Sequence, residues 1–282
     1  MIIGTLKGAL LFLGDSCMLV MANGAFKSGS TWLRNIILEM MEFQPIPESY
    51  RHPDYLLWIS SYRLADFLRE VDFQNHNFIS KGHLHSHKYV DLLLSHPDVR
   101  VFDITRDVRD VIVSHYYHMV REGKVKSEFG PYYWKLGRYK AYQIVEYHKL
   151  WSVDHPQMFV SSFESLKTDF HNEVRRIGSF LGCDLSEEDI DRIKDKTSLQ
   201  RLREKRGEEG VPEEKRFYRK GIIGDWQNHF DDDMARDIER IQESGLSGLS
   251  RLKYQAFFKI RPAVKAFFSR RSTRMRRLME KV

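Results

Sequence analysis

A short buried strand that leads through a glycine-bearing loop into an amphipathic helix is the feature that most limits the folds open to this chain. The strand is predicted at Leu19 to Ala22, four apolar residues followed by Asn23 and Gly24. The helix is predicted at Trp32 to Phe43, where apolar residues recur at helical spacing, with Ser30 and Thr31 as candidate caps. This order of elements is typical of the first unit of a parallel α/β sheet.

Further strands and helices alternate along the chain. Strands are predicted at residues 77–80, 101–105 and 157–161, and helices at 55–67, 109–120 and 172–181, the last ended by Gly182. The alternation predicts an α/β fold with a central parallel sheet flanked by helices and a P-loop-like strand–loop–helix that binds phosphate. Because α/β domains of about 250 residues are common, a single domain is expected.

Two sequence features bear on where the protein works. Gly8 to Gly14 has the apolar character of a short signal-peptide core, but Asp15 ends the run and cleavage beyond it would remove part of the fold, so we expect no signal peptide. Cys17 and Cys183 stand in apolar sequence and are expected to be buried thiols and not a disulfide, which fits a reducing compartment. A cytoplasmic location is therefore expected.

Positive charge is concentrated at the C-terminal end. Residues 251–282 hold eleven Lys or Arg and one acid, a net charge of +10, whereas the whole chain carries +6, so residues 1–250 sum to −4. The basicity belongs to this tail, and no nucleic-acid partner is expected for the main domain. We therefore divide the chain into a main domain, 1–250, and a basic amphipathic C-terminal extension, 251–282.

Apolar residues of the extension recur at roughly helical spacing among its cations. Such a helix can lie on an anionic membrane surface, each nearby cation adding about 1 kcal/mol. A helix that packs on the main domain with a solvated basic face is the alternative. Peripheral membrane contact through 251–282 is thus one of two open interpretations. No stretch reaches the roughly 18 consecutive apolar residues that cross a bilayer.

The loop after the first strand has the glycine spacing of a phosphate-binding loop. Gly24 and Gly29 are separated as in G-x-x-x-x-G-K-[ST], but Ser30 stands where that motif has its lysine, and the lysine is found at Lys27. Amides at the helix N-terminus can still hold a phosphate. Without a lysine after Gly29, a ligand with a shorter anionic chain than a nucleoside triphosphate is favoured. A plain strand–helix turn is the alternative.

Three other segments carry basic residues beside predicted strand ends or glycines. They are Lys81 to Leu84 (KGHL), Thr105 to Ser114 (TRDVRDVIVS) and Arg219 to Phe230 (RKGIIGDWQNHF). With Lys27 to Trp32 (KSGSTW), they resemble K-T-H-L, C-R-N-P-K-D-V-A-V-S, R-K-G-x-x-G-D-W-K-N-H-F and K-S-G-T-T-W of the cytosolic-type sulfotransferases. Members of that family use 3′-phosphoadenosine 5′-phosphosulfate (PAPS) as sulfuryl donor. The matches extend from about Cys17 to Phe230.

The resemblance implies a set of donor-binding residues. The 5′ phosphosulfate is expected at the loop, where Trp32 would stack on adenine: Lys27, Ser28, Gly29, Ser30, Thr31 and Trp32. The 3′ phosphate is expected at Arg106, Ser114, Arg219, Lys220 and Gly221, since a guanidinium presents a planar fork to phosphate.

Two positions depart from the family pattern. Phe163 stands where the family often has Tyr, so a hydroxyl contact is lost. Thr197-Ser198-Leu199 resembles T-S-F, and Leu199 replaces an aromatic residue that sandwiches the base. Donor binding is expected to be retained but weaker, because aromatic stacking contributes about 1 kcal/mol.

The same resemblance implies catalytic roles. His83 is the expected general base, since a neutral histidine suits proton transfer from a hydroxyl near neutral pH. Lys27 would stabilise or protonate the leaving 5′ phosphate, Lys81 would support the sulfuryl oxygens, and Ser114 would restrain Lys27 until the acceptor arrives. The scheme uses no metal. His83, His85 and His87 would share a strand face and so suggest a metal site, but no Cys or acid completes the set.

The acceptor is predicted less closely: a hydroxyl of a small molecule, lipid or carbohydrate. Gln200 to Phe217 stands where the family has an acceptor-covering loop, and its dense charge suits either a polar lid or a solvated loop. Several aromatic residues are candidates for the pocket or for the core: Tyr116, Tyr117, His118, Tyr132, Tyr133 and Trp134. The family's dimer motif is broken from Gln227 onward, so dimerisation is not carried over.

Two other functions compete with sulfuryl transfer. A P-loop-type nucleoside or small-molecule kinase is disfavoured by the absence of lysine after Gly29 and by the Arg219-Lys220-Gly221 segment. A non-catalytic nucleotide-binding protein is disfavoured by the set of Lys27, Lys81 and His83. Binding of adenosine 3′,5′-bisphosphate (PAP) or of ATP with Mg²⁺ separates these alternatives.

Overall fold

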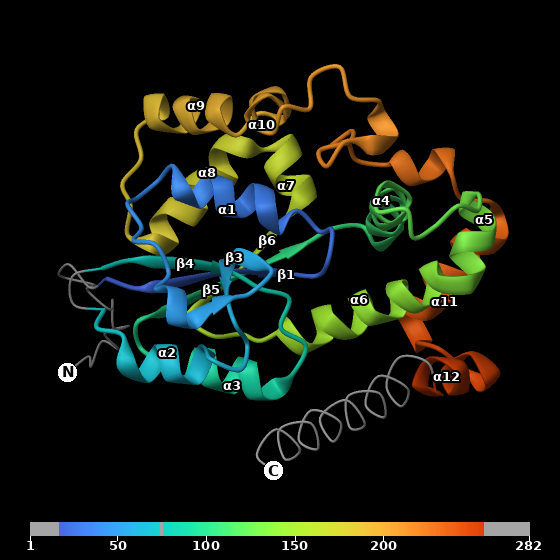
Figure 1. Ribbon diagram of the computed structural model, residues 1–282, viewed down its shortest axis with the longest axis horizontal. Helices are drawn as coiled ribbons and strands as arrows, with labels where there is room; N and C mark the ends of the chain where they lie inside the picture. The colour runs from blue at the N-terminus through green and yellow to red at the C-terminus, as the bar shows by residue number, and fades with distance from the viewer. Residues whose placement is uncertain (1–16, 74–75, 257–282) are drawn as a thin grey trace, which may run out of the picture.

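The computed structural model describes residues 17–73 and 76–256 (Figure 1). The signal-like segment Gly8 to Gly14 and most of the basic extension, 257–282, lie outside the described residues. The division of the chain at residue 250 therefore stays a prediction. No helix in the described ranges is both long and apolar enough to cross a membrane.

A four-stranded parallel sheet in the order β4-β1-β5-β6 forms the centre of the fold. Its strands are β1 (Leu19–Gly24), β4 (Phe78–Lys81), β5 (Val99–Thr105) and β6 (Met158–Ser162). A separate antiparallel pair consists of β2 (Arg51–His52) and β3 (Tyr55–Ile59). Since all four central strands run the same way, their carboxyl ends meet at one edge, where parallel sheets bind ligands.

Helices cover both faces of the sheet, as Figure 1 shows. On one side lie α1 (Ser30–Leu38), α7 (Phe163–Thr168), α8 (Phe170–Leu181) and α9 (Glu187–Lys196). On the other side lie α2 (Leu64–Glu70), α3 (His87–Leu94) and α6 (Arg138–Trp151). The remaining helices are α4 (Val108–Arg121), α5 (Phe129–Tyr132), α10 (Leu199–Lys205), α11 (Asp232–Ser244) and α12 (Gly248–Tyr254). Short turns are η1 (Glu48–Tyr50), the π-helical η2 (Tyr133–Gly137), η3 (Glu213–Lys215) and η4 (Asp225–Asn228).

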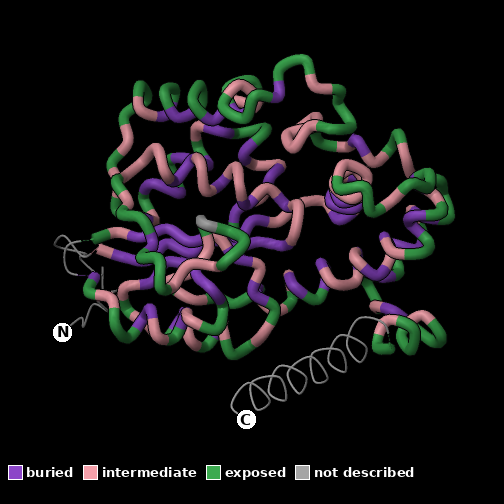
Figure 2. The backbone as a smooth tube through the Cα atoms, in the orientation of Figure 1, coloured by how far each residue is buried: buried purple, intermediate pink, exposed green. Residues whose placement is uncertain are grey.

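Alternation along the strands divides the buried apolar residues into two cores. In β1, Leu19 and Met21 join the core on the α2, α3 and α6 side, whereas Val20 joins the core under α1, α8 and α9. This is the period-2 pattern of a strand with both faces covered. The tube in Figure 2 is accordingly buried along the central strands and exposed along the outer helix turns. The predicted α/β fold with a flanked parallel sheet is confirmed.

The predicted strands and most predicted helices are confirmed, but 55–67 is not one helix. Its first half is β3, and α2 begins only at Leu64. The aromatic and β-branched residues Tyr55, Trp58 and Ile59 favour a strand, and the amide of Ile59 donates to Ser80 Oγ at 2.9 Å. This long-range contact is invisible to local periodicity.

Three smaller expectations also change. The first helix ends at Leu38 and not at Phe43, and Gly29, not Ser30 or Thr31, occupies its N-cap position. Cys17 and Cys183 are free thiols as expected, but both are only half-buried.

Candidate active site

The phosphate loop connects the end of β1 to the start of α1. Gly24 has φ 152°, and a side chain there would place its Cβ 2.8 Å from Ile104 Cγ2, so the close approach of β1 and β5 requires glycine. Gly29 has φ 108° and precedes the helix, whose first amides have no partner within the helix. Lys27 has φ 69°, a left-handed conformation unusual for a side-chain-bearing residue. The Oγ of Ser28 is buried and has no hydrogen-bond partner within residues 17–73 and 76–256.

Two lysines lie at the loop, Lys27 within it and Lys81 at the end of β4. Lys27 Nζ lies 5.0 Å from the centre of the Phe217 ring, and Lys81 Nζ donates to Thr31 Oγ1 at 2.7 Å. Burial, followed by the positive charges of Arg121 and Lys81, lowers the pKa of Lys27 to about 7. Burial also lowers the pKa of Lys81 to about 8. Both lysines therefore exchange a proton more readily near neutral pH than an ordinary lysine.

His83 follows β4 and is held by the backbone of β1. Its Nδ1 lies 2.6 Å from the carbonyl oxygen of Gly24. A carbonyl can only accept, so Nδ1 carries the proton and Nε2 keeps its lone pair. Burial, assisted by the charge of Lys81, lowers the pKa of His83 to about 3, so the ring is neutral near pH 7. A neutral ring with a free Nε2 has the protonation state that a general base needs.

A second cationic cluster lies where α4 faces the segment after residue 218. Arg219 and Lys220 share the buried carboxylate of Asp225, the latter at 2.8 Å. Although burial raises the pKa of Asp225, hydrogen bonds from Lys220 and Arg219 hold it well below its usual range. Arg106 donates to the carbonyl of Ile222 at 2.9 Å. The cluster therefore keeps its charges in fixed positions.

Asp110 attaches this cluster to α4. Its two carboxylate oxygens accept from the amides of Gly224 at 2.8 Å and Trp226 at 2.9 Å, and Arg106 lies 3.8 Å away. The side chain is fully buried. One carboxylate thus joins residues that are more than 110 positions apart in the sequence.

Aromatic side chains lie between the two clusters. Trp32 packs edge-on to Phe163 at 5.5 Å and stacks on Phe170 at 6.2 Å, and the guanidinium of Arg106 covers the Phe163 ring at 4.1 Å. Leu199 lies close to Gly221, where an added Cβ would stand 3.6 Å from Leu199 Cδ2.

Two other predicted site residues are placed as follows. Thr197 is buried, and its hydroxyl donates to the carbonyl of Ile193. Ser114 lies on α4, partly exposed, and no hydrogen bond joins it to Lys27 in the described residues. The roles assigned to the site residues stay predictions.

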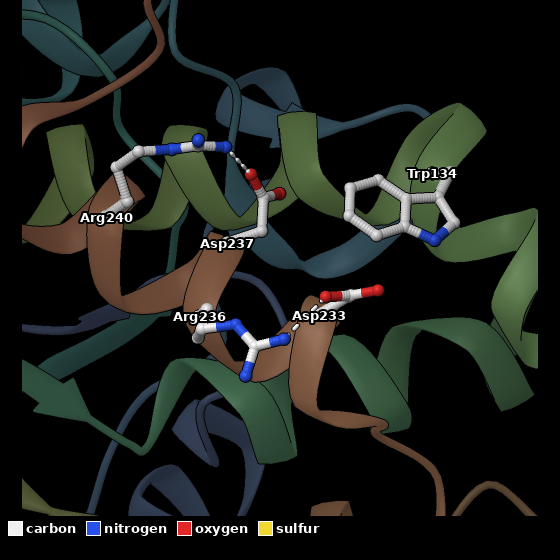
Figure 3. A pocket seen from close by; sticks show the side chains of 5 residues that line it. All are labelled: Trp134, Asp233, Arg236, Asp237 and Arg240. Atoms are coloured by element: carbon white, nitrogen blue, oxygen red, sulfur yellow. Dashed lines mark hydrogen bonds and ion pairs between the residues drawn. The ribbon is translucent and has the colours of Figure 1, made fainter.

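The aromatic candidates for an acceptor pocket separate into two groups. Tyr132 and Tyr133 are core residues, and the hydroxyl of Tyr133 donates to Asp237 at 2.9 Å. Trp134 borders a pocket against α11 (Figure 3). The other lining residues, Asp233, Arg236, Asp237 and Arg240, form ion pairs along that helix. This polar pocket contains none of the predicted site residues.

The side chains around His83 include several that local sequence patterns do not identify. Phe26 packs edge-on to His83 at 5.6 Å, to His115 at 5.3 Å and to His118 at 5.2 Å. Trp58 also packs edge-on to His83, at 5.1 Å. The only sequence signal for Phe26 was its position beside Lys27.

The charged segment Gln200 to Phe217 is anchored and not simply solvated. It contains α10 and η3, and Glu208 is buried and accepts from the amides of Phe217 at 2.9 Å and Tyr218 at 3.2 Å. These bonds hold Phe217 over Lys27, where Arg121 and Arg206 also cover its ring.

The three histidines that alternate in the sequence are not arranged on one strand. The strand β4 ends at Lys81, and His87 already begins α3, so His83, His85 and His87 do not share a strand face. Across 17–73 and 76–256, no group of three His, Cys, Asp or Glu side chains is placed to hold a metal ion.

A parallel α/β sheet, a loop with the glycine spacing of a phosphate-binding loop, two groups of cations and a neutral histidine define a class of protein suited to an anionic ligand. The family model for the sulfotransferase domain matches residues 19–250, and the chain belongs to this family. It is a sulfotransferase.

Relatives and solved structures agree with the family. The chain is 28% identical to a flavonol sulfotransferase-like protein of Flaveria bidentis, with 79% of each chain covered. It is 26% identical to cytosolic sulfotransferase 3 of Arabidopsis thaliana, covering 81% of this chain and 77% of the relative. The fold matches mouse sulfotransferase SULT7A1 complexed with PAP, with TM-score 0.58, 15% identity and coverage of 90% and 89%. It also matches retinol dehydratase in complex with androsterone and PAP, with TM-score 0.55, 21% identity and 82% of each chain covered.

Proposed function

We propose that this sulfotransferase moves a sulfuryl group from PAPS to a hydroxyl of a small-molecule, lipid or carbohydrate acceptor, with His83 as general base. The observation that carries the proposal is the Nδ1 contact of His83 with Gly24, because it leaves Nε2 as the proton acceptor beside two lysines of lowered pKa. The PAP complexes among structures of the same fold support the donor.

In the proposed reaction the acceptor hydroxyl gives its proton to His83 Nε2 while its oxygen attacks sulfur. The bond between sulfur and the bridging oxygen of the 5′ phosphate breaks in line. Lys27 stabilises or protonates the phosphate that leaves, and Lys81 neutralises the sulfuryl oxygens. Positioning and electrostatics supply most of the rate enhancement, as in phosphoryl transfer. The scheme uses no metal ion.

The donor is proposed to lie across the N-terminus of α1. Ser28 to Thr31 would hold the 5′ end, because the buried Ser28 Oγ has no hydrogen-bond partner among the described residues and the first amides of α1 have none within the helix. Arg106, Arg219 and Lys220 would hold the 3′ phosphate with the Gly221 backbone. Ser114 would contribute there from α4. Adenine would lie against Trp32, bordered by Phe163, Thr197 and Leu199.

Thermal unfolding with and without nucleotide tests the donor. PAP should stabilise the protein by about 3 kcal/mol at a hundredfold excess over its dissociation constant, whereas ATP with Mg²⁺ should have little effect. Arg219→Ala should abolish most of this shift, and Arg236→Ala, which removes a surface ion pair on α11, should leave it intact. Stabilisation by ATP with Mg²⁺ alone would instead favour a kinase. Stabilisation by PAP without turnover of PAPS on any acceptor would favour a non-catalytic nucleotide-binding protein.

We further propose a cytoplasmic enzyme that contacts membranes peripherally through 251–282. Support comes from α12, which leads into this region and in which Leu249 and Leu252 are 74% and 60% exposed beside the cations Arg251 and Lys253. Sedimentation with anionic vesicles should recover the full chain and lose a chain lacking 251–282. Equal partitioning of the two would remove the proposal. Neutral vesicles serve as the control, since the cations should not enrich the protein there.

A further inference from the structure

One cation near Lys27 has no role in the proposed binding of the donor. Arg121 is the last residue of α4. Among the cations that depress the pKa of Lys27, Arg121 acts most strongly, ahead of Lys81, Arg106 and Arg219. Those three are proposed to contact the donor, whereas Arg121 has no role in that scheme.

The guanidinium of Arg121 is held in place but not saturated. It donates to His118 Nδ1 at 2.8 Å, to Glu122 at 3.1 Å and to the carbonyl of Arg216 at 3.5 Å. Its side chain is only 19% exposed. A guanidinium has five N–H donors, and the contacts given by the described residues use three of them. The other two have no hydrogen-bond partner among the described residues, although the guanidinium also forms an ion pair with Glu122.

His118 complements Arg121. Because its Nδ1 accepts from Arg121, its Nε2 carries the proton when the ring is neutral. Burial, followed by the charges of Lys27 and Arg121, lowers the pKa of His118 to about 4, which keeps the ring neutral near pH 7. The pair therefore presents N–H donors only, the arrangement that recognises a carboxylate.

An apolar path connects this pair to the proposed base. The Phe26 ring contacts His118 at 5.2 Å and His83 at 5.6 Å. Roughly one aromatic ring thus separates the hydroxyl-activating histidine from the cationic pair, a spacing that suits a flat apolar molecule laid along Phe26. Its hydroxyl would face His83, and an anionic group would face Arg121.

We infer that Arg121 and His118 form an acceptor subsite for an oxyanion, so that the enzyme selects hydroxylated acceptors that carry a carboxylate about one ring away from the reacting hydroxyl. The inference rests on the proposed function, since the subsite is defined relative to His83. Its alternative is a structural role, in which Arg121 only clamps Phe217 and the Arg216 carbonyl over Lys27.

A matched pair of acceptors tests the inference. We would measure kcat/KM at saturating PAPS for 3-(4-hydroxyphenyl)propanoate and for its methyl ester, which share ring, spacer and phenol acidity but differ in charge. The wild-type protein should prefer the acid by about tenfold or more, the range of a charge-assisted hydrogen bond. Arg121→Met should reduce this preference to about twofold or less, mainly through KM for the acid.

Arg206→Met is the control variant. Arg206 also covers the Phe217 ring, at 4.3 Å, and pairs with Glu208, but it is not among the charges that act on Lys27. The acid-to-ester preference should survive this substitution. A purely structural role of Arg121 predicts instead that both variants lower turnover of the two acceptors equally, with the preference unchanged.

Three results would overturn the inference. They are a wild-type protein that prefers the ester, an Arg121→Met variant with unchanged preference, and failure of both acceptors to react in a protein that PAP stabilises. The last result leaves the proposed sulfuryl transfer from PAPS standing and rejects only the acceptor class. Absence of PAP stabilisation rejects the proposed function and this inference with it.

Discussion

The two ends of the proposed donor site handle positive charge in opposite ways. At the end near α4, Arg219 and Lys220 share Asp225, and Arg106 lies near Asp110. At the phosphate loop, Lys27 and Lys81 form no ion pair within the described part of the chain. Hydrogen bonding to Asp225 raises the pKa of Lys220, whereas burial lowers that of Lys27 to about 7.

This difference suits the two ends to different functions, donor binding at the paired end and catalysis at the loop. A cation fixed by a carboxylate keeps its proton and its position, which suits the recognition of a phosphate that does not react. A lysine without such a partner, and with a pKa near ambient pH, suits a group that must meet developing charge or pass on a proton. We expect substitutions at the loop to change turnover, with Lys27 also contributing to donor affinity when it is protonated, and substitutions at the paired end to change donor affinity alone.

The largest expected effect on turnover is that of removing the His83 side chain. His83→Ala should lower kcat by about 10²-fold or more, because the general base is lost, with donor affinity nearly unchanged. Initial-rate kinetics together with PAP titration check both halves. His85→Ala, which removes an exposed ring packed on Tyr147, serves as control and should retain turnover. Unchanged turnover in His83→Ala would contradict the assignment.

The loop lysine should make PAP binding depend on pH. The anions of PAP favour the charged form of Lys27 and should raise its pKa from about 7, so the complex binds more protons than the free protein. Affinity should therefore be full below about pH 7 and fall roughly twentyfold by about pH 9. Calorimetry in buffers of different ionisation enthalpy measures the proton uptake. Lys27→Met should flatten the profile, and a slope retained in that variant would assign the effect elsewhere.

Loss of the Asp110 carboxylate should weaken donor binding and leave the proposed general base, His83, unchanged. In Asp110→Asn, a single amide oxygen replaces two carboxylate oxygens, so one of the amides of Gly224 and Trp226 loses its partner. We expect the free energy of unfolding to fall by about 1–3 kcal/mol and PAP affinity by about tenfold. Denaturant unfolding and PAP titration measure the two effects.

The matched control for that substitution is Asp233→Asn. Asp233 lies in the exposed pocket of Figure 3 and pairs with Arg236 on the same helix. It should change the free energy of unfolding by no more than about 0.5 kcal/mol. Equal effects of the two substitutions would show that Asp110 has no special role in attaching the cluster of Arg106, Arg219 and Lys220 to α4.

The smallest expected effect is a gain. Leu199→Phe supplies the aromatic side chain that the family pattern has beside the base and should tighten PAP by about fivefold, or roughly 1 kcal/mol. A ribose 3,5-bisphosphate without the base should bind both proteins equally. Equal improvement for the two ligands would show that residue 199 does not contact adenine.

Local sequence patterns predicted the parts of the molecule that are local in structure. The glycine spacing at Gly24 and Gly29 indicated the phosphate loop, and the alternation of strands and helices indicated the sheet. The strand at Tyr55 was missed because its partner contacts come from β2 and from Ser80, which local periodicity does not record.

The site residues also divide into those that the sequence identified and those that depend on distant partners. Lys27, Lys81 and His83 stand in short segments that resemble motifs of the family, so they could be named in advance. Asp110 lies inside a segment that was identified, yet its partners follow 114 and 116 residues later. Phe217 covers Lys27 because Glu208 anchors its backbone, and in the sequence Glu208 is one acid among many.

The left-handed backbone of Lys27 limits how far selection for stability alone can raise the stability of this enzyme without loss of activity. A side-chain-bearing residue at φ 69° stores strain of about 1 kcal/mol or more that glycine would release. A screen that rewards heat resistance would therefore favour Lys27→Gly and discard the lysine that we propose acts on the leaving phosphate. We expect lysine to be retained at position 27 only under selection for sulfuryl transfer. Its presence in descendants of this chain would therefore indicate that they still catalyse the reaction.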